Sequence, residues 1–197
     1  MTLLALLRHG STAWNDDGRM QGHQDIPLTA VACRTLAALR PPPALDGFAW
    51  VTSPLARARE TARLLVPDAV PAIEPALIEA SWGEWEGVAL HALRLRHGDG
   101  FTAMERKGLD FLPPGGESPR MVQQRLAPWL AKIGAAGRPT AAVTHKGVIR
   151  AVLGLATGWD FLGKPPARLD WSAVHVFAVN ADGTVRIEQM NLPLMPR

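Results

Sequence analysis

The sequence predicts an α/β fold, namely a three-layer α/β/α sandwich with a largely parallel central sheet. Short continuous apolar runs at Leu3–Leu7, Phe48–Thr52 and Thr140–Thr144 are typical of strands buried on both faces. Helical periodicity follows each run, and this alternation favours parallel strands joined by crossover helices. The length of 197 residues suits one domain, which we expect to span residues 1–197.

Helix boundaries are indicated by capping residues and prolines. Thr29–Arg40 is expected to be helical until the three prolines at 41–43 end it. Pro54–Leu65 is expected to form a helix with Ser53 as its N-cap and Pro54 at its first position. Further helices are expected over Val88–Arg96, Ser118–Ile133 and Val148–Ala156.

The C-terminal part of the chain predicts a β-hairpin. Its strands are Ala173–Val179 and Thr184–Met190, joined by a turn at Asn180–Gly183. The stretch from about 76 to 118 is richer in loop residues, with a loop at Pro113–Gly116. We interpret this stretch as an insertion over the carboxyl ends of the strands.

Composition excludes several classes of protein. Apolar residues make up 47% and charged residues 20%, which is typical of a globular domain. No apolar run is long enough to span a bilayer, and the N-terminus lacks the pattern of a signal peptide. Cys33 is the one cysteine, so no internal disulfide is possible and a reducing, cytoplasmic location is expected.

The net charge of +3 raises the question of nucleic-acid binding. The basic residues form no consecutive block, and the chain has no tyrosine and only 5 phenylalanines for a stacking surface. We therefore expect no nucleic-acid partner and no membrane partner. Seventeen of the 21 basic residues are arginine, whose planar fork suits phosphate and carboxylate groups.

Histidine and arginine side chains gather where the three predicted strands end. Arg8 and His9 follow the first, Arg57 lies on the helix after the second, and His145 follows the third. Ligands of open α/β sheets bind at the carboxyl ends of the strands. Helix N-termini near residues 54 and 146 add N–H groups and positive partial charge. The pattern predicts a site for a phosphoryl group.

Metal and nucleotide chemistry find little support in the sequence. There is no HExxH motif and no cluster of cysteine and histidine, and His91 and His97 do not share a helical face. Neither a P-loop nor a GxGxxG motif follows a strand. We expect no metal and no cofactor.

The motifs in their order along the chain carry a family resemblance. The N-terminal part reads RHGSTAWN at 8–15, GRMQGH at 18–23 and DIPLT at 25–29. The remainder reads SPLARA at 53–58, TA at 61–62, LIE at 77–79, GEWEG at 83–87, GGES at 115–118 and VTH at 143–145. The chain resembles the histidine phosphatase superfamily, whose members are phosphoglycerate-mutase-like, and within it the small phosphatases that include alpha-ribazole phosphatase.

The resemblance implies a two-step phosphoryl transfer. His9 would attack phosphorus and become a phosphohistidine, which water then hydrolyses. Arg8, Arg57 and His145 would hold the equatorial oxygens. Glu79 would protonate the leaving oxygen, with Trp82 available to desolvate it.

The resemblance also marks neighbouring positions. Asn15, Gln21 and Gly22 match further pocket positions of the family, and Glu84 and Glu86 are rivals of Glu79 for the acid. His23 is expected near the entrance, Trp82 and Trp85 in the core of the insertion, and His175 and Cys33 away from the chemistry.

Two positions depart from many relatives. Position 11 is serine where glutamate is common, and position 146 is lysine where glycine is common. At the rim of an anion pocket, Lys146 would attract substrates with a second negative group.

The prediction is a metal-independent phosphatase of small phosphomonoesters. The alternatives are a cofactor-dependent phosphoglycerate mutase, whose insertions are typically longer, and a non-catalytic module that binds phosphorylated ligands on the same fold.

Overall fold

A six-stranded sheet lies at the centre of the protein. The computed structural model describes residues 1–197, and the strands are β1 (Thr2–Arg8), β3 (Ala49–Thr52), β4 (Ala72–Ile73), β5 (Thr140–Thr144), β6 (Val174–Val179) and β7 (Val185–Leu192). Their order is β4-β3-β5-β1-β6-β7. The first four of these are parallel, and β6 and β7 are antiparallel. The predicted α/β fold with a largely parallel sheet is confirmed.

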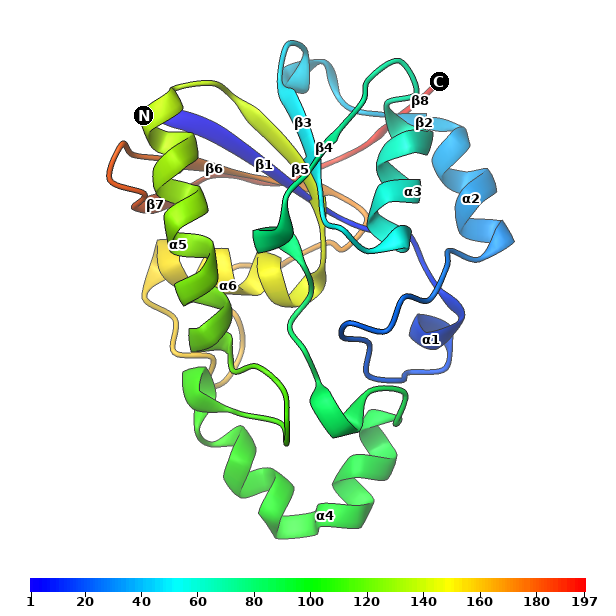
Figure 1. Cartoon of the computed structure of the whole chain (residues 1–197), viewed down its shortest axis with the longest axis vertical. Helices are drawn as coiled ribbons and strands as arrows, with labels where there is room; N and C mark the ends of the chain where they lie inside the picture. The colour runs from blue at the N-terminus through cyan, green and yellow to red at the C-terminus, as the bar shows by residue number, and fades with distance from the viewer.

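Helices cover both faces of the sheet (Figure 1). α5 (Pro119–Ala136) and α6 (Lys146–Thr157) pack on one face, and α2 (Ala30–Ala37) and α3 (Ala56–Leu65) on the other. Successive side chains of β1 point to opposite faces of the sheet and contribute to both apolar layers. Leu4 and Leu6 face α5 and α6, while Ala5 and Leu7 face the opposite layer. This explains why the run carries no polar residue.

Several boundaries follow the expected chemistry. Ser118 caps α5 by accepting the Met121 N–H at 3.2 Å. The C-terminal hairpin forms as predicted, and its turn is closed by the Gly183 N–H on the Asn180 carbonyl at 2.9 Å. Parallel pairing of β1 and β5 aligns Arg8 with Thr144. The two histidines that come next therefore leave the sheet side by side.

The helix expected over Thr29–Arg40 is shorter than predicted. It ends at Ala37, and β2 (Leu39–Arg40) instead pairs with β8 (Met195–Pro196). The chain end imposes this change, because the Arg197 N–H donates to the Ala38 carbonyl at 2.9 Å. Pairing between segments this distant leaves no mark in the local sequence pattern.

The start of α3 also differs from the prediction. Ser53 is not its N-cap and Pro54 is not its first residue, since the helix begins at Ala56 after the extended Leu55. A remote side chain takes over the capping, because Asp25 Oδ1 accepts the Ala56 N–H at 2.7 Å. α6 likewise begins at Lys146 rather than Val148, and its N-cap position is His145.

The segment 76–118 lies over the carboxyl ends of the parallel strands (Figure 1). It contains α4 (Leu90–Glu105), which is longer than predicted and kinked at Gly98, where φ is +48°. Trp85, Leu93 and Phe101 form a small apolar core of its own, with Trp82 packed against it. The tryptophans are thus insertion core, as predicted. No helix of the structure has the length and apolarity that crossing a membrane requires.

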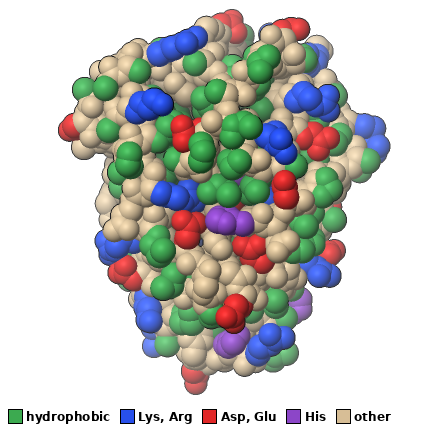
Figure 2. Space-filling view, in the orientation of Figure 1, with side chains coloured by type: hydrophobic (Ala, Val, Ile, Leu, Met, Phe, Trp, Pro, Cys, Tyr) green, Lys and Arg blue, Asp and Glu red, His purple; other side chains and the backbone are tan.

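The face drawn in Figure 2 mixes charges of both signs. Lys and Arg side chains alternate there with Asp and Glu side chains and do not gather into one basic patch.

Candidate active site

A cavity of about 1190 Å³ opens between the ends of the parallel strands and the segment 76–118. Arg8 and His9 reach it from the end of β1, Glu79 from the start of the inserted segment, and Lys146 from α6. No group of three or more His, Cys, Asp or Glu side chains lies at metal-binding distance anywhere in the chain. The residues brought together are thus cations, imidazoles and carboxyls, and Glu79 is the one buried carboxyl among them.

His9 is buried, with 5% of its surface exposed, and its orientation is fixed by backbone groups. Its Nδ1 lies 2.7 Å from the Gly10 carbonyl, which can only accept, so Nδ1 carries the proton and Nε2 keeps its lone pair. Burial, followed by the charges of Arg8 and Arg57, holds the pKa of His9 well below its usual value. His9 is therefore a neutral imidazole with an available nucleophilic nitrogen.

His145 lies beside His9, with ring centroids 5.1 Å apart. Its Nε2 is 2.7 Å from Ser53 Oγ, which already accepts the Leu55 N–H at 3.3 Å. Nε2 is the one acceptor within reach of the Ser53 hydroxyl proton, so we assign the hydroxyl as donor to Nε2. This assignment places the His145 proton on Nδ1, a buried atom with no partner in the protein. Burial is the main reason why the pKa of His145 is held well below its usual value. A neutral imidazole with an unpaired N–H suits an anionic ligand.

The two arginines are placed differently. Arg57 is fully buried, and its Nη1 and Nη2 donate to the Gln24 and Gly22 carbonyls, both at 2.8 Å. Its Nε has no partner, and neither has the Nε of Arg8, which lines the cavity. Desolvation lowers the pKa of both guanidinium groups, yet an arginine stays charged. Arg57 thus contributes a fixed charge whose fork is partly committed to the 22–24 loop.

Glu79 is the buried carboxyl of the cavity, with 7% of its surface exposed. Its Oε1 accepts the Ala80 N–H at 2.8 Å, and both carboxyl oxygens accept the Gly147 N–H. Desolvation raises the pKa of Glu79, against the opposing effects of these N–H groups and of Arg57 and Arg8. A raised pKa is what a general acid requires.

The geometry separates Glu79 from its two rivals. Glu84 is exposed and is not among the cavity residues. Glu86 accepts backbone N–H groups of His23 at 2.8 Å, Gln24 at 2.9 Å and Trp82 at 3.2 Å. Glu86 therefore ties the 22–24 loop to the inserted segment.

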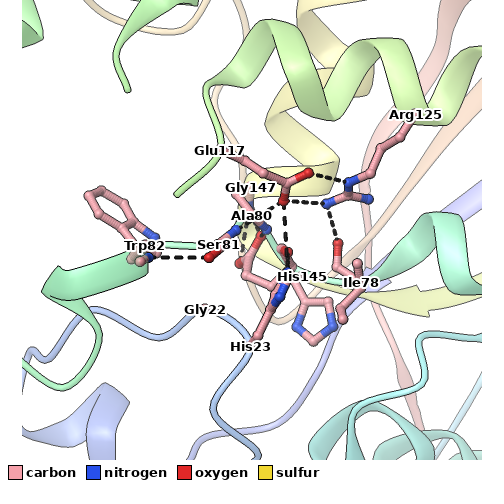
Figure 3. A network of polar contacts seen from close by, with 12 residues as sticks. Gly22, His23, Ile78, Ala80, Ser81, Trp82, Glu117, Arg125, His145 and Gly147 are labelled. Atoms are coloured by element: carbon pink, nitrogen blue, oxygen red, sulfur yellow. Dashed lines mark hydrogen bonds and ion pairs between the residues drawn. The ribbon is translucent and has the colours of Figure 1, made fainter. Parts of the chain in front are cut away.

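A polar network supports the backbone from Ile78 to Trp82 (Figure 3). Arg125 donates to the Ile78 carbonyl at 2.6 Å and to Glu117 Oε1 at 3.0 Å. Glu117 Oε2 in turn accepts the Ser81 N–H at 3.0 Å. His23 Nε2 lies 2.9 Å from the Glu79 carbonyl oxygen, so His23 supports this segment from the opposite side. These contacts position Glu79 rather than take part in chemistry.

Some of the other predicted binding residues line the cavity, and others hold the residues that line or flank it. Asn15, Gln21 and Lys146 line the cavity. Gln21 hydrogen-bonds Thr12, while its Oε1 is buried without a partner. Gly22 does not line the cavity, and its carbonyl holds Arg57 instead. A Cβ at position 22 would collide with the Glu86 carboxylate, so glycine is required there for close approach.

Sequence reasoning missed Ser53 and Glu86 in their actual roles. Ser53 followed by proline is a frequent helix start, and this local signal hid its contact with His145. Thr61 belongs to the motif residues but was given no role, although its Oγ1 accepts the Gly10 N–H at 3.0 Å and donates to the Arg57 carbonyl at 2.7 Å. Only the spacing of Thr61 from Arg57, one helical turn, could have suggested the link.

Fold and site together define a class of protein. The family model described as "Histidine phosphatase superfamily (branch 1)" matches residues 4–192, and the chain belongs to this superfamily. It is a phosphoglycerate-mutase-like enzyme of that superfamily.

Three known proteins to which the chain is similar include one mutase and two phosphatases. The chain is 34% identical over 174 residues to 2,3-bisphosphoglycerate-dependent phosphoglycerate mutase 2 of Gloeobacter violaceus, which covers 78% of this chain and 74% of the relative. It is 28% identical over 183 residues to the adenosylcobalamin/alpha-ribazole phosphatase of Escherichia coli, covering 88% and 89%. The structure of a mycobacterial glucosyl-3-phosphoglycerate phosphatase in complex with VO3 superposes with a TM-score of 0.77 at 26% identity, covering 98% and 100%.

Proposed function

We propose that this enzyme is a metal-independent phosphatase that hydrolyses a small phosphomonoester through a phosphohistidine at His9. The observation that carries the proposal is the fixed tautomer of His9. Its Nδ1–H is held by the Gly10 carbonyl, and Nε2 is left as the nucleophile. The same cavity contains Glu79 with a raised pKa. Nucleophile and acid are thus supplied together.

In the first step, His9 Nε2 attacks phosphorus and the bond from phosphorus to the leaving oxygen breaks. Glu79 gives its proton to that oxygen, so the leaving group departs as an alcohol. Arg8, Arg57 and the Nδ1–H of His145 stabilise the charge on the three transferred oxygens. The products of this step are an alcohol, a phosphohistidine and an ionised Glu79.

In the second step, water attacks the phosphohistidine. Glu79, now a carboxylate, accepts the proton of that water, and the bond between phosphorus and Nε2 breaks. Orthophosphate leaves, and both His9 and Glu79 return to their starting protonation states. No step requires a metal.

A phosphoglycerate mutase is the second candidate, because the Gloeobacter relative carries that name. The two activities differ in what removes the phosphoryl group from His9, which is water in one and a hydroxyl of the bound substrate in the other.

The test is phosphate release from p-nitrophenyl phosphate, alpha-ribazole phosphate and 3-phosphoglycerate in excess chelator. We expect hydrolysis that needs no metal and that vanadate inhibits, as the VO3 complex of the mycobacterial phosphatase suggests. Phosphoryl transfer between phosphoglycerates that depends on added 2,3-bisphosphoglycerate, without net phosphate release, would establish the mutase instead. Activity lost to the chelator and restored by a divalent metal would overturn the proposal.

A further inference from the structure

Two cations on α6 line the catalytic cavity without any acidic partner. Lys146 and Arg150 are one helical turn apart and share one face of the helix. Neither side chain belongs to an ion pair, whereas Arg94 of the same cavity pairs with Glu105 at 2.7 Å. Neither positive charge is therefore neutralised by an ion pair within the protein.

Aromatic rings hold Arg150 in place. Its guanidinium carbon lies 5.0 Å from the ring centre of Trp159 and 5.2 Å from that of Phe161. These two rings stack on each other at 4.3 Å. Contacts of this kind fix the fork of an arginine while leaving its N–H groups available. The Nε of Arg150 is indeed buried and unpartnered.

Backbone strain accompanies this arrangement. Phe161 has a φ of +69°, a left-handed conformation that is unfavourable for an aromatic residue. Such conformations persist where the surrounding structure imposes them, often at ligand sites. Here the turn brings the Phe161 ring back over α6, where it lines the cavity beside Arg150.

Lys146 completes the group from the cavity rim. Its Nζ lies 5.1 Å from the ring centre of Trp171. Desolvation, followed by the charges of Arg150 and Arg8, lowers the pKa of Lys146, and the Glu79 carboxyl opposes this shift only in part. Desolvation and mutual repulsion of these cations raise the free energy of the empty site, and an anion that binds between them lowers it.

We propose that Lys146 and Arg150 form a second anion subsite, which binds a carboxylate or second phosphoryl group of the substrate while His9 attacks the first phosphoryl group. This inference rests on the proposed function and narrows its substrate class to phosphomonoesters with a second negative group. Arg150 supplies the oriented fork, and Lys146 supplies a mobile point charge.

The test uses ligands that bind without turnover. Methylphosphonate carries one anionic group, whereas phosphonoacetate, 3-phosphonopropionate and 1,3-propanediyl bisphosphonate carry a second one at increasing reach or charge. Calorimetric titration of the wild type should show at least one of these ligands binding about tenfold or more tightly than methylphosphonate. The carboxylate and bisphosphonate members show which second group the subsite prefers.

The variants are Arg150→Gln and Lys146→Gln, with Arg138→Gln as the matched control. Arg138 is exposed and lies after α5, so this control makes the same charge change outside the cavity. We expect Arg150→Gln to abolish most of the tenfold advantage and Lys146→Gln to reduce it by a factor of about 2–5. The advantage should shrink in high salt, and Arg138→Gln should preserve it.

Arg150→Lys distinguishes a role of the charge from a purely structural role of Arg150, because lysine keeps a positive charge beside the aromatic rings. It should retain part of the advantage. If Arg150→Gln weakens methylphosphonate and the longer ligands equally, with a matching fall in melting temperature, the subsite is refuted. Binding of methylphosphonate with no advantage for any longer ligand also refutes the subsite alone. No binding of methylphosphonate, together with no hydrolysis of p-nitrophenyl phosphate, refutes the proposed function instead.

Discussion

Replacing Glu86 with glutamine separates a structural carboxylate from a catalytic one. Glu86 accepts three backbone N–H groups that belong to two segments distant in sequence, the 22–24 loop and the start of the 82–86 turn. The loop carbonyls of Gly22 and Gln24 in turn hold Arg57. Loss of the carboxylate should therefore loosen both the fold and the Arg57 fork.

The expected loss of stability in Glu86→Gln follows from the backbone N–H groups that lose their acceptor. Glutamine keeps one carbonyl oxygen but turns an NH2 group toward backbone donors, so at least one N–H loses its acceptor and the remaining bonds lose their charge. A hydrogen bond to a charged group contributes about 1.5–3 kcal/mol, so we expect the free energy of unfolding to fall by about 2–3 kcal/mol. For a chain of this size that corresponds to a fall in melting temperature of roughly 4–12 °C.

The assay pairs calorimetric or spectroscopic melting with kinetics on two substrates. Glu86→Gln should lower kcat/KM to the same extent for p-nitrophenyl phosphate and for an alkyl phosphate, because it acts through Arg57 in both cases. Glu79→Gln should slow the alkyl phosphate far more, because p-nitrophenolate needs little protonation to leave. The reasoning is refuted if Glu86→Gln melts like the wild type and slows only the alkyl phosphate.

Two further predictions concern the histidines. Ser53→Ala should lower kcat about 10-fold or more, because His145 loses the hydroxyl that fixes its tautomer. It should also lower the melting temperature, because the buried His145 Nε2 and the Leu55 N–H lose their partner. Ser53→Thr should retain much of the activity, and a pH–rate profile identical in wild type and Ser53→Ala would contradict the role of Ser53. Stability should decrease as the pH falls below about 6.5, because the unfolded chain then binds protons that the buried His9 and His145 exclude, giving a slope of up to about 1.4 kcal/mol per pH unit for each imidazole. Urea unfolding of the wild type and of His145→Gln between pH 7 and 5 measures how the free energy of unfolding changes with pH. If the pH dependence is as steep in His145→Gln as in the wild type, His145 is not its cause.

Local patterns accounted for five strands of the sheet and for the residues at their ends, but not for the two-residue edge strand β4. The strands β1, β3 and β5 are apolar except at their threonines and at Arg8, because helices cover both faces of the sheet. Parallel strands necessarily end at one edge, which brings Arg8, His9 and His145 together without further information.

Contacts between distant segments were beyond the sequence. Asp25 caps α3 from a loop 31 residues away, and the chain end pairs with Leu39–Arg40. The tautomers of His9 and His145 depend on single acceptors and donors fixed only by the fold. The same holds for Glu86, whose donors come from two loops with no regular spacing.

The measurement that tests the account most directly is rapid-quench trapping of the phosphoenzyme. The wild type is mixed with a radiolabelled phosphomonoester and quenched within one turnover. We expect protein-bound label that is stable in base, labile in acid and located on His9 by peptide mapping. His9→Ala should carry no label and should not turn over substrate. Label that persists in His9→Ala, or steady turnover by the wild type with no trapped phosphoprotein, would contradict a phosphohistidine at His9.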